Sequence, residues 1–140
     1  MVRDRKPRVM IIDENSGVRQ FYTLELVESG YDVITVEDAA AFKEAVGRSR
    51  PDLIILDPWI GGRHRWDILS GIKEDHALVP VLLCLAFDVS FPNDVAPAEG
   101  FVLKSSLTAD FLLKVEEIMG VSRKRKLPKN GGSIWTKSRR

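Results

Sequence analysis

The sequence contains very little cysteine and no long apolar run. Cys84 is its only cysteine, so the chain cannot form an intramolecular disulfide, as is typical of a protein in a reducing compartment. The basic residues near the N-terminus are followed by only four apolar residues, 9–12, which is too short for a signal-peptide core or a membrane span. We therefore expect a cytoplasmic protein that does not enter a membrane.

Acidic side chains are missing from the last part of the chain. Residues 121–140 contain eight basic side chains and no acidic one, whereas residues 1–120 contain 20 acidic and 13 basic side chains, a net charge of −7. The last segment has no apolar periodicity, so we expect a basic, disordered tail and no second domain there. Such a tail can contact nucleic acid. The sequence contains no recognition-helix pattern, so we do not expect nucleic-acid binding by any other part of the chain.

Short apolar runs alternate with stretches of helical periodicity along the rest of the chain. Each run is rich in Val, Ile and Leu and has no polar residue at its centre, which indicates strands buried on both faces of a parallel sheet. The five runs are Arg8–Asp13, Asp32–Val36, Leu53–Asp57, Val79–Leu85 and Gly100–Leu103.

The helical stretches carry recognisable start and stop signals. The first pattern stops at Gly30, and Asp38 is expected to cap the second helix. The clearest apolar stripe lies within residues 111–119 and is expected to end at Gly120.

The fourth interval is different because it contains Pro92 and Pro97, which leave room for little more than one helical turn. The sequence therefore predicts an α/β domain at residues 7–120, preceded by an extension at residues 1–6. Its expected architecture is a flavodoxin-like (βα)5 doubly wound parallel sheet, strand order 2-1-3-4-5, with a short or broken fourth helix.

Charged residues stand at the carboxyl ends of three expected strands. Asp13 and Glu14 end the first strand, Asp57 ends the third, and Lys104 follows the fifth. In this fold those strand ends meet at one crevice. Clustered carboxylates favour a hard cation such as Mg²⁺, and a lysine opposite them supplies charge for an anion. A metal, a carboxylate nucleophile and a lysine together indicate phosphoryl transfer onto aspartate.

Three segments, in order, carry a family resemblance. The stretch Ile12-Asp13-Glu14-Asn15, the run from Pro51 to Asp57, and the end of the fifth strand from Phe101 to Ser105 resemble the receiver domains of two-component response regulators. The resemblance covers roughly residues 7–120. It implies a single-domain signalling module rather than an enzyme, with a histidine kinase or phosphotransfer protein as donor and an unknown downstream protein target.

The resemblance also implies roles for individual residues. Asp57 would accept the phosphoryl group. Asp13 and Glu14 would hold Mg²⁺ together with Asp57 and the backbone carbonyl of Trp59. Lys104 would contact the acyl phosphate. Phe101 matches the aromatic switch position of the family.

The sequence departs from the family pattern at several positions. Leu85 stands where the family has a Ser or Thr hydroxyl that bonds the phosphoryl oxygen. Gly61, His64 and Arg65 replace a proline and an Asp-Gly pair, and Ser105 replaces a proline after Lys104. These departures leave open an alternative, a receiver-like docking module that acts without phosphorylation.

The remaining candidates favour ordinary structural roles. A hydrolase with an aspartate nucleophile needs a second carboxylate two residues later, where Trp59 stands. Cys84 is expected in the core, and His64 is expected to have no functional role. Trp59 and Trp66 are expected to cover the loop after the third strand.

Overall fold

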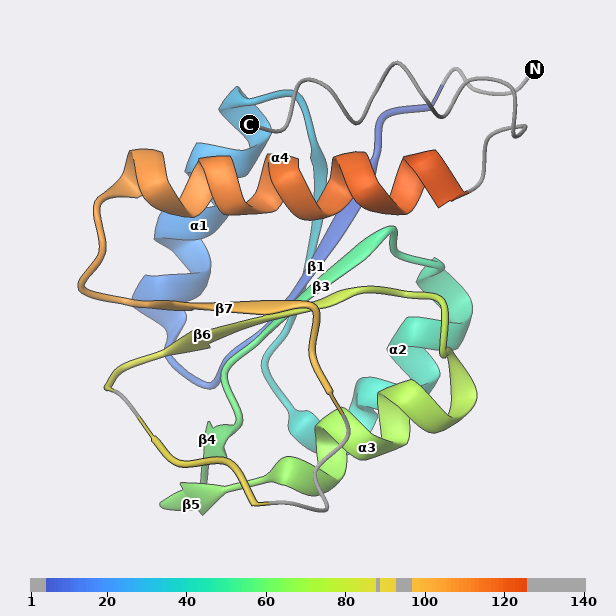
Figure 1. Ribbon diagram of the computed structural model, residues 1–140. Helices are drawn as coiled ribbons and strands as arrows, with labels where there is room; N and C mark the ends of the chain where they lie inside the picture. Colours follow the sequence, from blue (N-terminus) through green and yellow to red (C-terminus); the bar gives the residue numbers. More distant parts are fainter. Residues whose placement is uncertain (1–4, 88, 93–96, 126–140) are drawn as a thin grey trace.

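A parallel sheet runs through the centre of the molecule, with helices on both of its faces (Figure 1). The structure is a computed structural model that describes residues 5–87, 89–92 and 97–125. Its sheet consists of β1 (Arg8–Ile12), β2 (Asp32–Val36), β3 (Leu53–Leu56), β6 (Val81–Leu85) and β7 (Gly100–Leu103). Its helices are α1 (Ser16–Glu28), the 3-10 turn η1 (Ala39–Ala41), α2 (Phe42–Ser49), α3 (Trp66–Asp75) and α4 (Thr108–Arg125).

The strand order is β2-β1-β3-β6-β7, and every neighbouring pair is parallel. This confirms the expected doubly wound, flavodoxin-like order, in which β6 and β7 are the fourth and fifth strands. β1 and β3 are neighbours at the point where the winding direction reverses, and ligands of such sheets bind outside the carboxyl ends of those strands.

Two apolar clusters form the core because successive side chains of a strand point to opposite faces. Val9 and Ile11 of β1 face α1 and α4, whereas Met10 and Ile12 face α2 and α3. Strands buried on both faces account for the continuous apolar runs in the sequence. Cys84 is fully buried in the α1/α4 cluster, as expected.

Some element ends differ from the sequence-based expectation. β1 and β3 each end one residue early, so Asp13 and Asp57 follow their strands. The Asp38 carboxylate accepts a hydrogen bond from the N–H of Ala40 and caps η1, so α2 begins without a side-chain cap. α4 runs through Gly120 to Arg125, because a single glycine lowers helix stability without necessarily ending the helix.

The segment between β6 and β7 contains no helix in its described residues, 86, 87, 89–92 and 97–99, in agreement with the expected short or broken fourth helix. The expected tail lies largely outside the described residues, which end at 125. No helix within the described ranges combines the length and the apolar character that crossing a bilayer requires.

A small hairpin follows β3 and was not expected from the sequence. β4 (Trp59–Ile60) and β5 (Arg63–His64) pair antiparallel around a two-residue turn. Gly61 and Gly62 have φ angles of 64° and 84°, which fits the turn type that joins two strands most tightly. The hairpin lies next to the carboxyl ends of β1 and β3 and therefore belongs to the surroundings of the candidate site.

Candidate functional site

Two buried carboxylates lie side by side at the carboxyl ends of β1 and β3. Ile12 and Leu56 are register partners, and the N–H of Asp57 donates a hydrogen bond to the carbonyl oxygen of Ile12 at 3.0 Å. Asp13 and Asp57, the residues that follow these partners, are only 3% and 5% exposed. Among the described residues they are the only buried charged side chains.

The ammonium group of Lys104 joins the two carboxylates. Its Nζ lies 2.6 Å from Oδ2 of Asp57 and 2.8 Å from Oδ2 of Asp13. Lys104 follows β7, the edge strand, and its side chain reaches across the end of β6 to the site. The structure therefore brings together Asp13, Asp57 and Lys104 as the sequence predicts, and their roles stay predictions.

Burial and mutual charge act on the pKa values at this site. Burial raises the pKa of Asp13, although hydrogen bonds from Lys104 and from the Asn15 backbone oppose the rise. Burial alone would lower the pKa of Lys104, but its hydrogen bonds to Asp13 and Asp57 outweigh that effect and raise it. Lys104 therefore stays charged at neutral pH.

The second oxygen of each carboxylate accepts a backbone hydrogen bond from the residue two positions later. Oδ1 of Asp13 accepts from the N–H of Asn15 at 2.8 Å, and Oδ1 of Asp57 accepts from the N–H of Trp59 at 3.0 Å. Asn15, not Asp13, caps α1 by accepting from the N–H of Val18. Asp13 thus stays available to the site while both carboxylates are held in fixed orientations.

Glu14 points to the hairpin. Its Oε1 accepts a hydrogen bond from the N–H of Gly61 at 3.0 Å, which ties the end of β1 to the β4–β5 turn. Glu14 and the carbonyl of Trp59 stay predicted metal ligands.

The donor chemistry of the site fits Mg²⁺ in part. Across the described ranges, no group of three or more His, Cys, Asp or Glu side chains is arranged to hold a metal. Asp13 and Asp57 nevertheless supply hard oxygens that already converge on one cationic group, the Lys104 ammonium. Glu14 would have to leave Gly61, or share its second oxygen, to join them.

The two predicted switch positions differ in burial. Leu85, the last residue of β6, is 2% exposed and packs in the α2/α3 cluster, so an apolar side chain occupies the strand end where a hydroxyl was expected from the family pattern. Phe101 in β7 is 48% exposed and contacts Phe91 with ring centroids 6.3 Å apart.

Aromatic side chains surround the hairpin next to the acidic site. Trp59 makes edge contacts with His64 at 4.9 Å and with Phe87 at 6.2 Å between ring centroids. His64 stacks on Trp66 at 5.2 Å with an interplanar angle of 11°. Trp59 and Trp66 therefore do flank the loop after β3, and the histidine that sequence reasoning set aside lies between them.

Sequence reasoning missed two features of the site. Arg19 of α1 donates from Nη1 to the carbonyl oxygen of Asp13 at 2.7 Å and pairs with Glu37 at 3.0 Å, so it positions the end of β1. Nothing in the sequence marks this arginine among the others. The hairpin did have a signal, because the pair Gly61-Gly62, which stands between Ile60 and Arg63, is typical of a tight turn.

Known proteins resemble this chain over the region that contains the sheet and the acidic site. A family model described as "Response regulator receiver domain" matches residues 9–116. The CAI-1 autoinducer sensor kinase/phosphatase CqsS of Vibrio cholerae is 21% identical over 110 residues, which is 76% of this chain and 15% of that protein. The alkaline phosphatase synthesis transcriptional regulatory protein PhoP of Bacillus subtilis is 25% identical over 84 residues, 60% of this chain and 35% of PhoP. The chain thus spans about a third or less of these curated relatives.

Solved structures share the fold. A CheY-like response regulator receiver domain protein from Methanospirillum hungatei superposes with a TM-score of 0.79 at 18% identity, covering 86% of this chain and 99% of that one. The response regulator TrrA of Thermotoga maritima, solved in complex with Mg²⁺-BeF, gives a TM-score of 0.69 at 23% identity and covers 81% and 98%. The structure of TrrA in complex with the histidine kinase ThkA gives a TM-score of 0.70 at 22% identity, and the match covers 79% of this chain and 97% of that one.

Proposed function

The chain belongs to the response regulator receiver domain family, and we propose that it accepts a phosphoryl group on Asp57 from a histidine kinase or phosphotransfer protein. In this proposal it signals through protein–protein contacts and acts in the cytoplasm. Receiver domains are signalling modules, and the proposed role is that of a switch.

The observation that carries the proposal is the contact between Asp57 and Lys104. A carboxylate that is 5% exposed and 2.6 Å from an ammonium group is held in a fixed orientation beside a cation, which suits a nucleophile. One lysine and one carboxylate already make a neutral ion pair, and the neighbouring Asp13 adds a second negative charge that such a pair does not require. The arrangement therefore favours a reactive site over a stabilising salt bridge.

The proposed step transfers phosphorus from nitrogen to oxygen. A carboxylate oxygen of Asp57 forms the new O–P bond while the P–N bond of the donor phosphohistidine breaks, and its electron pair leaves with the imidazole. The imidazole takes a proton from solvent. Lys104 then faces an acyl phosphate in place of a bare carboxylate and pairs with its oxygens.

Mg²⁺, when bound, would neutralise charge on the transferring group. Asp13 and Asp57 are the residues placed to hold it, with Glu14 and the Trp59 carbonyl as further proposed ligands. The solved complex of TrrA with Mg²⁺-BeF, a protein of the same fold, supports this proposal. The ThkA–TrrA complex likewise supports a histidine kinase as partner.

A small phosphodonor tests the proposed function without a partner. Incubation with phosphoramidate and Mg²⁺ should add one phosphoryl group, seen by intact mass, that hydroxylamine removes. Asp57→Asn should abolish the addition because an amide oxygen is a poor nucleophile. Asp75→Asn, at the exposed end of α3, is the matched control and should be modified as wild type is.

A second candidate function rests on Leu85. Its buried side chain offers no hydroxyl to a phosphoryl oxygen, so the chain lacks one contact that would favour a phosphorylated conformation. A receiver-like docking module that acts without phosphorylation is the alternative. Unmodified protein after prolonged incubation with phosphoramidate would favour it over phosphoryl transfer.

A further inference from the structure

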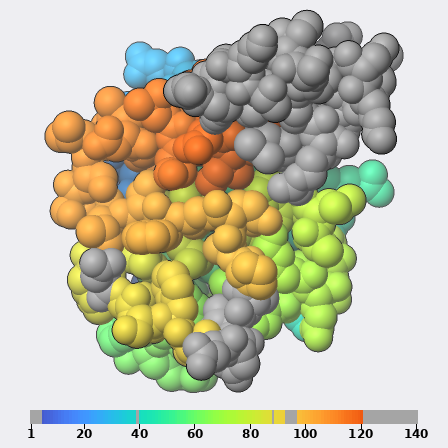
Figure 2. All heavy atoms as spheres, in the orientation of Figure 1, coloured from blue at the N-terminus to red at the C-terminus, as the bar shows by residue number. Residues whose placement is uncertain are grey.

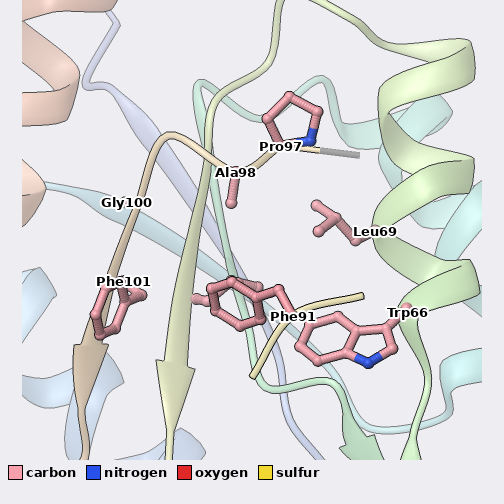
Figure 3. Close-up of a pocket in the computed structure, with 8 residues that line it drawn as sticks. Trp66, Leu69, Phe91, Pro97, Ala98, Gly100 and Phe101 are labelled. Atoms are coloured by element: carbon pink, nitrogen blue, oxygen red, sulfur yellow. The ribbon is translucent and has the colours of Figure 1, made fainter. Parts of the chain in front are cut away.

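An apolar pocket lies between α3 and the start of β7, on the face formed by these elements and the residues after β6 (Figures 2 and 3). Its volume is about 230 Å³, below the roughly 300–1,000 Å³ typical of small-molecule sites. Its size suits one large side chain better than a free ligand. Residues that line it include Trp66, Leu69, Phe91, Pro97, Ala98 and Phe101.

Aromatic rings at this pocket are left partly in solvent. Phe91 is 43% exposed and lies between Phe101 and Trp66 (Figure 3). It contacts both at steep angles, 85° to Phe101 and 82° to Trp66, with centroids 6.3 and 5.3 Å apart. Phe101 is 48% exposed. Adjacent exposed rings around a hollow mark a binding surface, and edge-to-face geometry accommodates a further ring.

The last helix covers the opposite face of the sheet from this pocket, but both border β7, the edge strand, so the chain after α4 has to pass only around that edge to reach the pocket. α4 packs over Gly100, a pocket residue, so closely that a Cβ on Gly100 would lie 3.3 Å from Cδ1 of Ile118. From Ile118 the helix continues for about 10 Å to Arg125, past the end of the sheet at which β7 begins (Figure 1). Residues 126–135 can span up to about 33 Å when extended, which is ample for a return to the pocket.

Residues 126–140 have the composition that such a contact needs. They contain three large apolar side chains, Leu127, Ile134 and Trp135, among five basic ones and no acid. The body of the chain, residues 1–120, carries a net charge of −7, so the field around it attracts a basic segment. Tryptophan, with tyrosine and arginine, is enriched among the side chains that dominate interfaces by filling buried pockets.

We propose that residues 126–140 fold back over the start of β7 and insert Trp135 into the pocket beside Phe91 and Phe101. The basic residues around Trp135 keep the segment near the acidic body, and burial of the indole supplies the specific contact. The occupant is this chain's own tail, and the contact does not depend on phosphorylation of Asp57.

A spin label on the tail of the full chain tests the proposal. Ser138→Cys provides one reactive thiol, because Cys84 is fully buried and burial raises the pKa of its thiol to about 12. A nitroxide on that thiol should broaden the backbone amide signals of Ala98 and Gly100. The amide of Val33, in the strand at the opposite edge of the sheet, should keep its intensity.

Two tail variants separate insertion from loose electrostatic contact. In the labelled chain, Trp135→Ala should remove the broadening at Ala98 and Gly100, whereas Leu127→Ala should leave it in place. Broadening that is absent, that is spread evenly over the surface, or that survives Trp135→Ala would overturn the proposal. A sample that mixes spin-labelled chain with isotope-enriched, unlabelled chain should show no broadening of the Ala98 and Gly100 amide signals. Broadening in that sample would mean that the tail of a second copy occupies the pocket.

Discussion

The backbone N–H of Lys104 donates a hydrogen bond to the carbonyl oxygen of Leu85 at 2.7 Å. The strand end that lacks a hydroxyl is thus fixed directly beside the lysine of the acidic site. Position 85 therefore neighbours the residue whose ammonium group contacts Asp57, and we expect its side chain to decide whether a group attached to Asp57 gains one more hydrogen bond.

Leu85→Thr should enlarge the conformational response to a phosphoryl mimic. A hydroxyl hydrogen bond to a charged acceptor contributes about 1.5–3 kcal/mol, which is roughly tenfold or more in a two-state equilibrium. With Mg²⁺ and beryllofluoride we expect small chemical-shift changes around Phe101 in wild type and larger ones in Leu85→Thr.

The control for this prediction is Leu83→Thr. Leu83 is also 2% exposed in the same cluster, two residues earlier in β6, so its replacement loosens the core without placing a hydroxyl at the strand end. A response in wild type as large as in Leu85→Thr, or an equal gain in Leu83→Thr, would contradict the argument from the missing hydroxyl.

Lys104→Met should destabilise the fold at neutral pH, because it leaves two buried carboxylates beside each other without a cation. We expect a loss of about 1–3 kcal/mol in the free energy of unfolding, less than for a fully buried pair because Lys104 is 18% exposed. Urea denaturation measures it. Millimolar Mg²⁺ should recover more stability in Lys104→Met than in wild type, and equal recovery would argue against a metal site at these carboxylates.

Asp13→Asn should stabilise the protein at pH 7. Folding raises the pKa of Asp13 above its unfolded value of 3.8, mainly through burial, so the folded state disfavours the ionised form. The resulting loss of folding stability is absent below pH 3.8 and grows as the pH rises through the pKa that Asp13 has in the folded state. The stability advantage of Asp13→Asn in urea denaturation should therefore shrink as pH falls from 7 towards 4. Asp75→Asn should show no such trend, and a lower stability of Asp13→Asn at every pH would contradict the prediction.

Mg²⁺ should change the fluorescence of Trp59, since its backbone N–H binds Asp57 and its ring contacts Phe87. A chain with Trp66→Phe and Trp135→Phe isolates this signal, and we expect saturation at roughly millimolar Mg²⁺. Asp13→Asn should remove the saturation. Glu14→Gln should weaken it while its amide oxygen still holds Gly61. A flat titration with Asp13 intact would contradict the proposed metal site.

The sequence predicted the sheet well because its signal is local. Strands buried on both faces are continuous apolar runs, and the charged residues after them, such as Asp13 and Asp57, stand out. Parallel order then brings those residues to one crevice without knowledge of any side-chain contact.

Other features were not predicted, because they depend on contacts between residues far apart in the sequence or on local signals that compete with one another. The hydrogen bond of Glu14 to Gly61 joins residues 47 positions apart, and the role of Arg19 depends on which way α1 faces. Gly120 looked like a helix stop, yet α4 continues, because one glycine costs a helix only about 1 kcal/mol and the basic residues 123–125 favour helix. The Gly61-Gly62 turn was present in the sequence, but Gly61 was interpreted only as a departure from the family pattern and Gly62 was not considered.

The most direct test of the central claim is to identify the residue that carries the phosphoryl group. After reaction with phosphoramidate and Mg²⁺, borohydride reduces an aspartyl phosphate to homoserine, which peptide mass spectrometry locates. The proposed function predicts homoserine at position 57 and nowhere else. Homoserine at another position, or none in a sample whose intact mass shows the phosphoryl group, would contradict it.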